Sequence, residues 1–204
     1  MAVRIGIDFD NTIVCYDTLF RKVALEQGLI PADLPNSKGA VRDHLRAVGK
    51  EDLWTAMQGE VYGKRMSEAH AFPGVLECMA RLVRLQIPVF IVSHKTRYPY
   101  LGPKYDMHEV ALSWLIEQRV FDPAGVDLPR EHAFFELTKQ AKLQRIADLK
   151  CTHFIDDLPE LLGDPEFPDS VLRLLFDPNQ QHPAERNCER FTSWCNIPSG
   201  LVAA

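Results

Sequence analysis

Short, nearly continuous apolar runs alternate with longer amphipathic stretches along most of the chain. The runs are rich in branched and aromatic residues, which favours buried strands over helices. They are VRIGI at 3–7, IPVFIVS at 87–93, HAFFEL at 132–137, THFID at 152–156 and VLRLLFD at 171–177. We expect each run to form one strand of a common sheet.

Between these runs, apolar residues recur at the spacing of an α-helix. The predicted helices cover 74–86, 107–120 and 138–150. Asp106, with Glu109 three residues later, resembles a capping box, and Thr138 is a candidate N-cap. Because apolar strands alternate with helices, the pattern predicts a parallel sheet covered on both faces. The predicted fold class is α/β, a doubly wound parallel-sheet core of Rossmann-like type.

The strand pattern disappears between about Cys15 and Ala71. Helical patterns replace it at 18–27, 37–49 and 51–66. We therefore expect a core domain made from 1–14 and 72–204 and a small all-helical cap domain at 15–71. An insert after the first strand is expected at the carboxyl edge of the sheet, where open α/β folds bind ligands. The tail from 182 to 204 shows one short helical pattern, AERNCERFTSW at 184–194, with no assigned role.

Composition limits the classes of function. The chain has 204 residues, 46% of them hydrophobic, and a net charge of −5, so a globular protein without a broad basic field is expected. No membrane partner and no nucleic-acid partner are predicted. Five widely spaced cysteines without a C-x-x-C pair indicate reduced thiols. Arg4 and Asp8 interrupt the first apolar run, so we expect no signal peptide and a cytoplasmic location. The oligomeric state is not indicated.

The candidate chemistry begins at the end of the first strand, with D8-F-D10-N-T12. Asp is disfavoured in strands, and residues at alternate positions point to the same side of an extended backbone. Asp8 and Asp10 would converge and repel each other unless a cation lay between them, which indicates a metal site. Acidic pairs also end strands as turn formers, so this motif alone leaves that interpretation open.

Further polar residues follow the other predicted strands. Ser93 closes the run at 87–93, and Asp156 with Asp157 closes the run at 152–156. Lys142 lies in the helix before that acidic pair, with Lys139 one turn earlier as its competitor. Each residue has an ordinary role in isolation, as a turn former or a solvated helix lysine. Together they are expected to meet, because a parallel sheet brings its strand ends to one edge.

In this order, the segments IDFDNT, FIVS, AKLQRI and FIDDL resemble the four motifs of the haloacid dehalogenase-like (HAD) superfamily of hydrolases. The resemblance covers 1–14 and about 72–178. The helical insert is similar to the C1 type of cap of that family in position and character only.

The resemblance implies that Asp8 is a nucleophile that forms an aspartyl-phosphate, with Asp10 as general acid and base. It also implies a Mg²⁺ ion held by Asp8, the backbone carbonyl of Asp10 and one carboxylate of the acidic pair. Asp157 is favoured as the direct ligand and Asp156 as the partner of the lysine, while the reverse assignment stays open. Lys142 and Ser93 would hold the phosphoryl oxygens.

The loop after the second motif offers candidate substrate contacts. His94, Lys95 and Arg97 lie together there and are candidates for binding an anionic or sugar-like substrate, although a solvated basic loop explains them equally well. Thr12 is a further candidate for substrate binding. Its favoured role is to order the turn after the first strand.

The predicted function is that of a Mg²⁺-dependent phosphatase acting on a small soluble phosphomonoester, a sugar phosphate or a nucleoside monophosphate. Asp10 supports it, since the dehalogenases, phosphonatases and P-type ATPases of the family carry no Asp at that position. Two alternatives remain: a polynucleotide end-processing phosphatase, which the acidic composition disfavours, and a phosphoryl-transfer or binding protein on the same fold.

Overall fold

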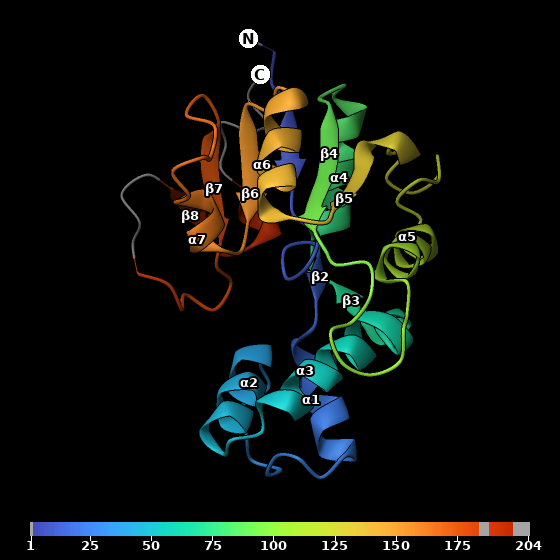
Figure 1. Ribbon diagram of the computed structural model, residues 1–204. Helices are drawn as coiled ribbons and strands as arrows, with labels where there is room; N and C mark the ends of the chain where they lie inside the picture. Colours follow the sequence, from blue (N-terminus) through green and yellow to red (C-terminus); the bar gives the residue numbers. More distant parts are fainter. Residues whose placement is uncertain (1, 184–187, 198–204) are drawn as a thin grey trace. The chain divides into compact units, whose positions relative to one another are not determined.

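The structure is a computed structural model that describes residues 2–183 and 188–197 (Figure 1). The chain divides into two compact units. The core unit draws on 1–13, 71–95 and 116–204, and the helical unit on 14–70 and 96–115. No helix among the described residues is long and apolar enough to cross a membrane.

The core unit is built on a six-stranded sheet with the strand order β5-β4-β1-β6-β7-β8. Every neighbouring pair is parallel. The strands are β1 (Ile5–Ile7), β4 (Val89–His94), β5 (Ala133–Glu136), β6 (His153–Asp156), β7 (Leu172–Phe176) and β8 (Glu189–Phe191). All predicted apolar runs form strands, and the predicted α/β fold class is confirmed. Ile7 of the central β1 lies between Ile91 and Ile155, so three strands end at the same edge.

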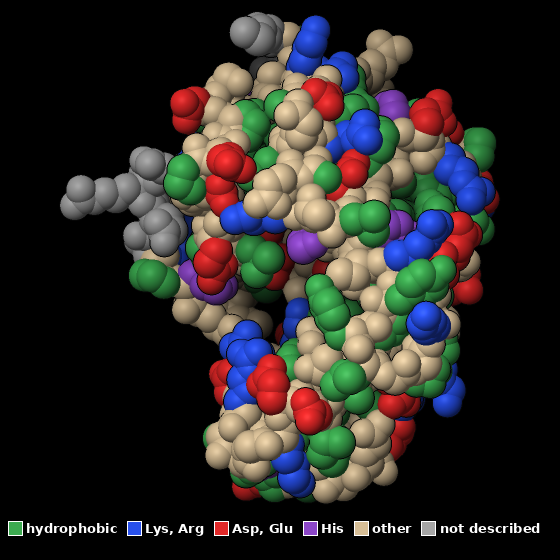
Figure 2. All heavy atoms as spheres, viewed as in Figure 1, with side chains coloured by type: hydrophobic (Ala, Val, Ile, Leu, Met, Phe, Trp, Pro, Cys, Tyr) green, Lys and Arg blue, Asp and Glu red, His purple; other side chains and the backbone are tan. Residues whose placement is uncertain are grey.

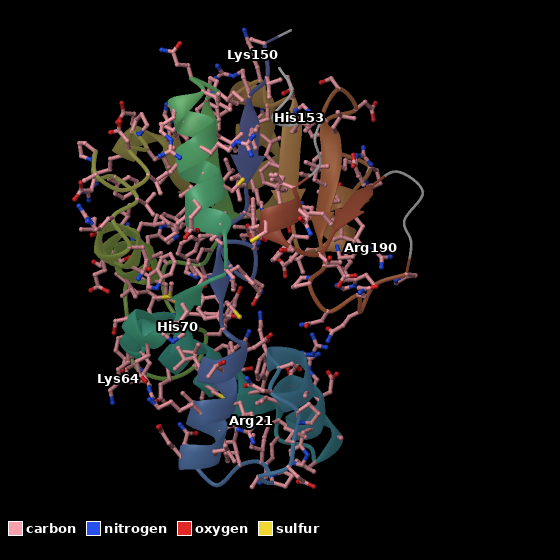
Figure 3. All side chains as sticks on the ribbon, turned by 180° about the vertical axis from the view of Figure 1, so that it is seen from behind. Arg21, Lys64, His70, Lys150, His153 and Arg190 are labelled. Carbon is pink, nitrogen blue, oxygen red and sulfur yellow. The ribbon has the colours of Figure 1, made fainter. Side chains whose placement is uncertain are left out.

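Helices cover both faces of this sheet. Helix α6 (Lys139–Asp148) lies in front of the sheet in Figure 1, and α4 (Val75–Arg84) lies on the opposite face, in front in Figure 3. The Thr138 hydroxyl accepts the backbone N–H of Ala141, which confirms the predicted N-cap of α6. The remaining helical segments of this unit are the 3-10 turns η3 (Arg130–His132) and η4 (Trp194–Asn196) and the short α7 (Pro159–Leu162).

The helical unit contains α1 (Asp17–Glu26), α2 (Lys38–Ala47), α3 (Glu51–Gly59), the π-helical turn η1 (Glu60–Lys64) and the 3-10 turn η2 (Met66–Glu68). Ser37 caps α2 by accepting the backbone N–H of Ala40. Arg21, labelled in Figure 3, ties the segment before α2 to α1 by donating to the backbone carbonyls of Ala32 and Leu34. The short strands β2 (Val14–Cys15) and β3 (His70–Ala71) pair with each other.

The assignment of residues 96–115 differs from the prediction, which placed them in the core domain. They belong to the helical unit, including most of α5 (Met107–Glu117). The buried Trp114 indole N–H donates to the Ala69 carbonyl, 3.0 Å away. A Cβ added to Gly63 would lie 2.5 Å from the Tyr105 ring, so the glycine permits this loop to pack closely. These contacts link residues far apart in the sequence, and periodicity does not reveal them.

The tail also differs from the expectation. The predicted helix at 184–194 is wrong over its described part, because Glu189–Phe191 form strand β8 and a 3-10 turn begins at Trp194. Residues 184–187 of that prediction lie outside the described residues. Phe191 stacks on Phe176 of β7, with ring centroids 5.2 Å apart. Pairing with an existing strand edge therefore outweighs the weak local helical pattern.

Candidate metal and catalytic site

The loop after β1 places Asp8 beside the end of β6. The backbone N–H of Asp8 donates to the Ile155 carbonyl, 2.9 Å away, which continues the β1–β6 ladder to the edge of the sheet. Asn11 then adopts a positive φ of 60°, a conformation that Asn tolerates better than most residues. The loop closes with the Ile13 N–H donating to the Phe9 carbonyl over 3.0 Å. Asp8, only 5% exposed, is thereby fixed in the core of the unit.

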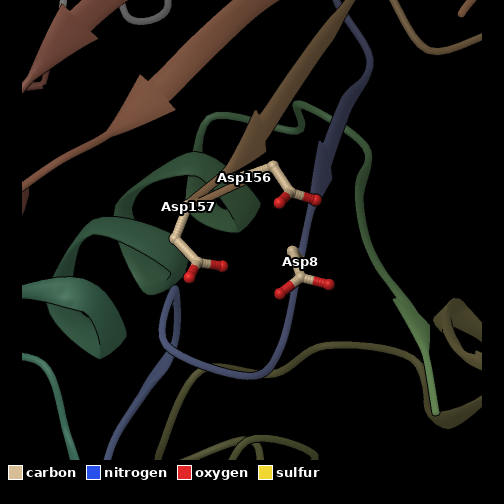
Figure 4. A group of neighbouring side chains, drawn as sticks. All are labelled: Asp8, Asp156 and Asp157. Carbon is tan, nitrogen blue, oxygen red and sulfur yellow. The ribbon is translucent and has the colours of Figure 1, made fainter. Parts of the chain in front are cut away.

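Three carboxylates meet at this edge of the sheet. Figure 4 shows Asp8 from the end of β1 facing Asp156 and Asp157 at the end of β6. Each offers one oxygen such that these atoms all lie within 4.8 Å of one another. Burying several negative charges together is unfavourable without a cation, so the arrangement is suited to holding a metal ion.

Lys142 supplies one positive charge to this cluster. Its ammonium donates to Asp8 Oδ1 and to Asp156 Oδ2, each at 2.6 Å, and the residue is 2% exposed. The competing Lys139 instead forms an ion pair with Asp164. The helical register of α6 therefore directs one lysine into the cluster and leaves the other with a separate partner.

The two carboxylates after β6 have different partners. Asp156 is fully buried, and its Oδ1 accepts the backbone N–H of Leu158 at 2.9 Å while its Oδ2 faces Lys142. Asp157 Oδ1 accepts the Thr12 hydroxyl at 3.3 Å. Asp156 therefore faces Lys142 and the backbone, whereas Asp157 faces the Thr12 hydroxyl.

Electrostatics agree with the need for a cation. Burial raises the pKa of Asp8 from 3.8 to about 7; Lys142 opposes this increase, and the neighbouring Asp156 and Asp10 reinforce it. Burial disfavours the Lys142 ammonium, but the charges of Asp156 and Asp8 outweigh that effect and raise its pKa. The single lysine thus keeps its charge without fully compensating the carboxylates around it.

Asp10 has a partner that the sequence did not indicate. The ammonium of Lys95 donates to both carboxylate oxygens of Asp10, at 2.9 and 2.7 Å. Lys95 is 4% exposed and lies over the Phe9 ring. The sequence made it a candidate for binding substrate, whereas the structure buries it as the counter-ion of Asp10.

The hydroxyl of Ser93 is a buried polar atom without a hydrogen-bond partner among the described residues. Ser93 lies near the end of β4, at the sheet edge where β1 and β6 also end. A buried hydroxyl rarely stays unpaired unless it meets a ligand or a water molecule. Ser93 is therefore available to an oxygen of a bound anion.

The other predicted substrate contacts lie in different surroundings. His94 follows Ser93 and is exposed overall, and partial burial of its ring, together with the charge of Lys142, lowers its pKa. Arg97 belongs to the helical unit, where its guanidinium donates to Asp106 at 3.0 Å. That same Asp106 accepts the backbone N–H groups of His108 and Glu109 at the start of α5.

One site contact has no sequence signal. The indole N–H of Trp194 donates to the backbone carbonyl of Thr12 across 182 positions of the chain. The structure thus brings together most of the predicted site and adds the buried Trp194 to it. The predicted residues at this sheet edge are Asp8, Asp10, Thr12, Ser93, Lys142, Asp156 and Asp157.

Comparison with known proteins identifies the fold. The sequence matches no protein-family model and no curated protein. A HAD-superfamily hydrolase from Ehrlichia chaffeensis superposes with a TM-score of 0.59 at 15% identity, covering 100% of this chain and 98% of that chain. A HAD-family hydrolase from Deinococcus radiodurans, with bound phosphate and sodium, gives 0.57 at 14%, covering 99% and 96%. L-2-haloacid dehalogenase from Xanthobacter autotrophicus, with covalently bound chloropropionic acid, gives 0.53 at 13%, covering 100% and 99%. Likeness at these identities shows a shared fold.

Proposed function

We propose that this chain, which has the HAD superfamily hydrolase fold, is a Mg²⁺-dependent phosphomonoesterase that uses Asp8 as its nucleophile. The observation that carries the proposal is the cluster of Asp8, Asp156 and Asp157, with one buried lysine paired to the first two. A small soluble phosphate ester is the expected substrate class, with sugar phosphates and nucleoside monophosphates as the leading candidates. The phosphate bound in the structurally similar Deinococcus protein is consistent with this chemistry.

The residues present fit a magnesium ion. Mg²⁺ is a hard cation that takes oxygen ligands and is usually held by one or two carboxylates. Asp8 and Asp157 would hold it, together with the backbone carbonyl of Asp10. When bound, the ion would neutralise the charge of the carboxylates and of an approaching phosphate.

Asp8 and Asp10 would divide the covalent and the proton steps. A carboxylate oxygen of Asp8 attacks phosphorus while the bond to the ester oxygen breaks, and Asp10 gives that oxygen a proton. Asp10 then takes a proton from water, which attacks phosphorus of the aspartyl-phosphate and releases inorganic phosphate. Asp8 is regenerated, so no net oxidation or reduction occurs.

Three further residues would support these steps. Lys142 already contacts Asp8 and would hold a phosphoryl oxygen as a point charge, and the buried Ser93 hydroxyl, which has no partner among the described residues, would donate to another. Lys95 fixes the orientation of Asp10.

The test is phosphate release from a panel of sugar phosphates, nucleoside monophosphates and short 3′-phosphorylated oligonucleotides, with Mg²⁺ or EDTA. We expect release that requires Mg²⁺ and is abolished by Asp8→Asn. Lys142→Ala and Lys139→Ala form a matched pair on one helix, and only the first should lose activity. Release that survives Asp8→Asn would show that another group is the nucleophile.

Two other activities are tested by the same panel. Halide release from 2-chloropropionate would favour the chemistry of the structurally similar dehalogenase over phosphate transfer. Preference for the oligonucleotides would favour a polynucleotide phosphatase. Figure 2 gives no support to the latter, because Lys and Arg side chains on that face are interspersed with Asp and Glu and form no continuous basic track.

A further inference from the structure

A buried side chain near the end of the described chain contacts the loop after β1, residues 8–13. Trp194 opens the 3-10 turn η4 (Trp194–Asn196) and is 2% exposed. Its indole N–H donates to the backbone carbonyl of Thr12 at 3.1 Å. Both residues belong to the core unit. The bond therefore links the end of the described chain to the loop that begins at Asp8.

Thr12 occupies a central place in that loop. Its hydroxyl lies 3.5 Å from Asp8 Oδ2 and 3.3 Å from Asp157 Oδ1. A hydroxyl has one proton to donate, so it serves either carboxylate, and its position sets how the two are spaced. The loop reaches this position through the left-handed residue Asn11. A donor that holds the Thr12 carbonyl also holds the hydroxyl between the two proposed metal ligands.

Trp194 is itself held firmly by the core unit. Its ring packs against Phe176 of β7 and Phe191 of β8, with centroid distances of 5.5 and 5.4 Å. The Ser193 hydroxyl accepts the backbone N–H of Cys195 and caps the turn. Gly74 leaves room for the turn, because a Cβ there would lie 2.9 Å from the Cys195 sulfur. The donor is thus fixed by the sheet and not by the loop that it contacts.

We propose that Trp194 is a positioning residue that orders the loop bearing Asp8 and Thr12 for metal binding. The inference rests on the proposed function, since it assumes that Asp8 and Asp157 hold Mg²⁺. The proposal gives the described chain after β7 a second role, besides adding strand β8 to the sheet. Residues that orient metal ligands commonly affect metal affinity by tenfold or more when they are changed.

Trp114 provides a matched control in the other unit. It is buried as deeply as Trp194, and its indole N–H also donates to a backbone carbonyl, that of Ala69 at 3.0 Å. The test compares Trp194→Phe with Trp114→Phe, each of which removes the donor and keeps an aromatic ring. Mg²⁺ alone is the probe, and its dissociation constant is measured by calorimetry on the full chain.

We expect Trp194→Phe to weaken Mg²⁺ binding by about tenfold, while Trp114→Phe changes it by less than about twofold, as expected when the lost donor serves Ala69 and not the loop. Equal affinities for the two variants would overturn the inference and leave the proposed function intact. Failure of the wild-type chain to bind Mg²⁺ would instead remove the proposed metal site, and the inference with it.

A milder variant covers the case in which Trp194→Phe does not fold. Ser193→Ala removes the cap of the same turn and retains the indole. We expect it to weaken Mg²⁺ binding by about twofold to fivefold, because the donor is held less firmly and one neutral hydrogen bond is lost. Unchanged affinity in folded Ser193→Ala would count against the inference.

Discussion

Replacing Asp8 by Asn should stabilise the metal-free protein at alkaline pH while abolishing catalysis. Burial raises the pKa of the Asp8 carboxyl from 3.8 to about 7, and the nearby Asp156 and Asp10 reinforce the effect. Ionised Asp8 is therefore unfavourable in the folded state without a metal. Asn has nearly the same shape, carries no charge and can still accept the hydrogen bond from Lys142.

The size of this stabilisation and the pH range over which it develops follow from the raised pKa of Asp8. An increase from 3.8 to about 7 corresponds to about 4 kcal/mol, at roughly 1.4 kcal/mol per pKa unit. Because the folded pKa is the higher one, the stability contributed by protonated Asp8 is complete below about pH 4 and is lost as pH rises through about 7. The advantage of Asp8→Asn should thus grow from near zero at pH 4 to at most about 4 kcal/mol at pH 8.

The assay is urea unfolding of both proteins in EDTA at pH 4.5, 6 and 8, because the difference between them cancels most other titrating groups. Asp164→Asn is a control of opposite sign, since the hydrogen bond from Lys139 lowers the pKa of Asp164. That variant should lose stability by nearly the same amount at all three pH values, because a pKa lowered from 3.8 confines the change to pH values below about 4. A constant advantage of Asp8→Asn across the pH range, or a loss at pH 8, would refute the reasoning.

The remaining predictions concern the lysines and the helical unit. Lys142→Met should lower kcat about 100-fold or more and destabilise the metal-free protein by about 3 kcal/mol in urea unfolding. Lys139→Met should leave kcat within about twofold of the wild-type value. Equal effects of the two substitutions would contradict the placement of Lys142. Lys95→Met should reduce kcat/KM more for an alkyl phosphate than for p-nitrophenyl phosphate, whose leaving group needs no proton; equal losses would exclude its role in positioning the acid. Gly63→Ala should lower the free energy of unfolding by about 1–3 kcal/mol, because the added Cβ would lie 2.5 Å from the ring of the tyrosine packed on it. Gly39→Ala is the control, since a Cβ there would have no neighbour closer than 3.8 Å outside the adjacent residues and the backbone of its helix, and it should raise the free energy of unfolding slightly.

The order of strands and motifs could be predicted from the sequence because each depends on local pattern. Continuous apolar runs predict buried parallel strands, and the acidic residues at the ends of 3–7 and 152–156 mark the carboxyl edge of the sheet. The convergence of Asp8 with Asp156 and Asp157 follows from that topology. A helix cap such as Thr138 is likewise a local feature.

Only the tertiary structure decided which charges meet. The pairing of Lys95 with Asp10 depends on the exit of β4 beside β1, and the bond from Trp194 to Thr12 spans 182 positions. Strand β8 forms because a free edge of β7 is available to it, and 96–115 join the helical unit because Gly63 admits the Tyr105 ring. Side-chain packing and edge pairing between distant segments have no period in the sequence, so no local pattern records them.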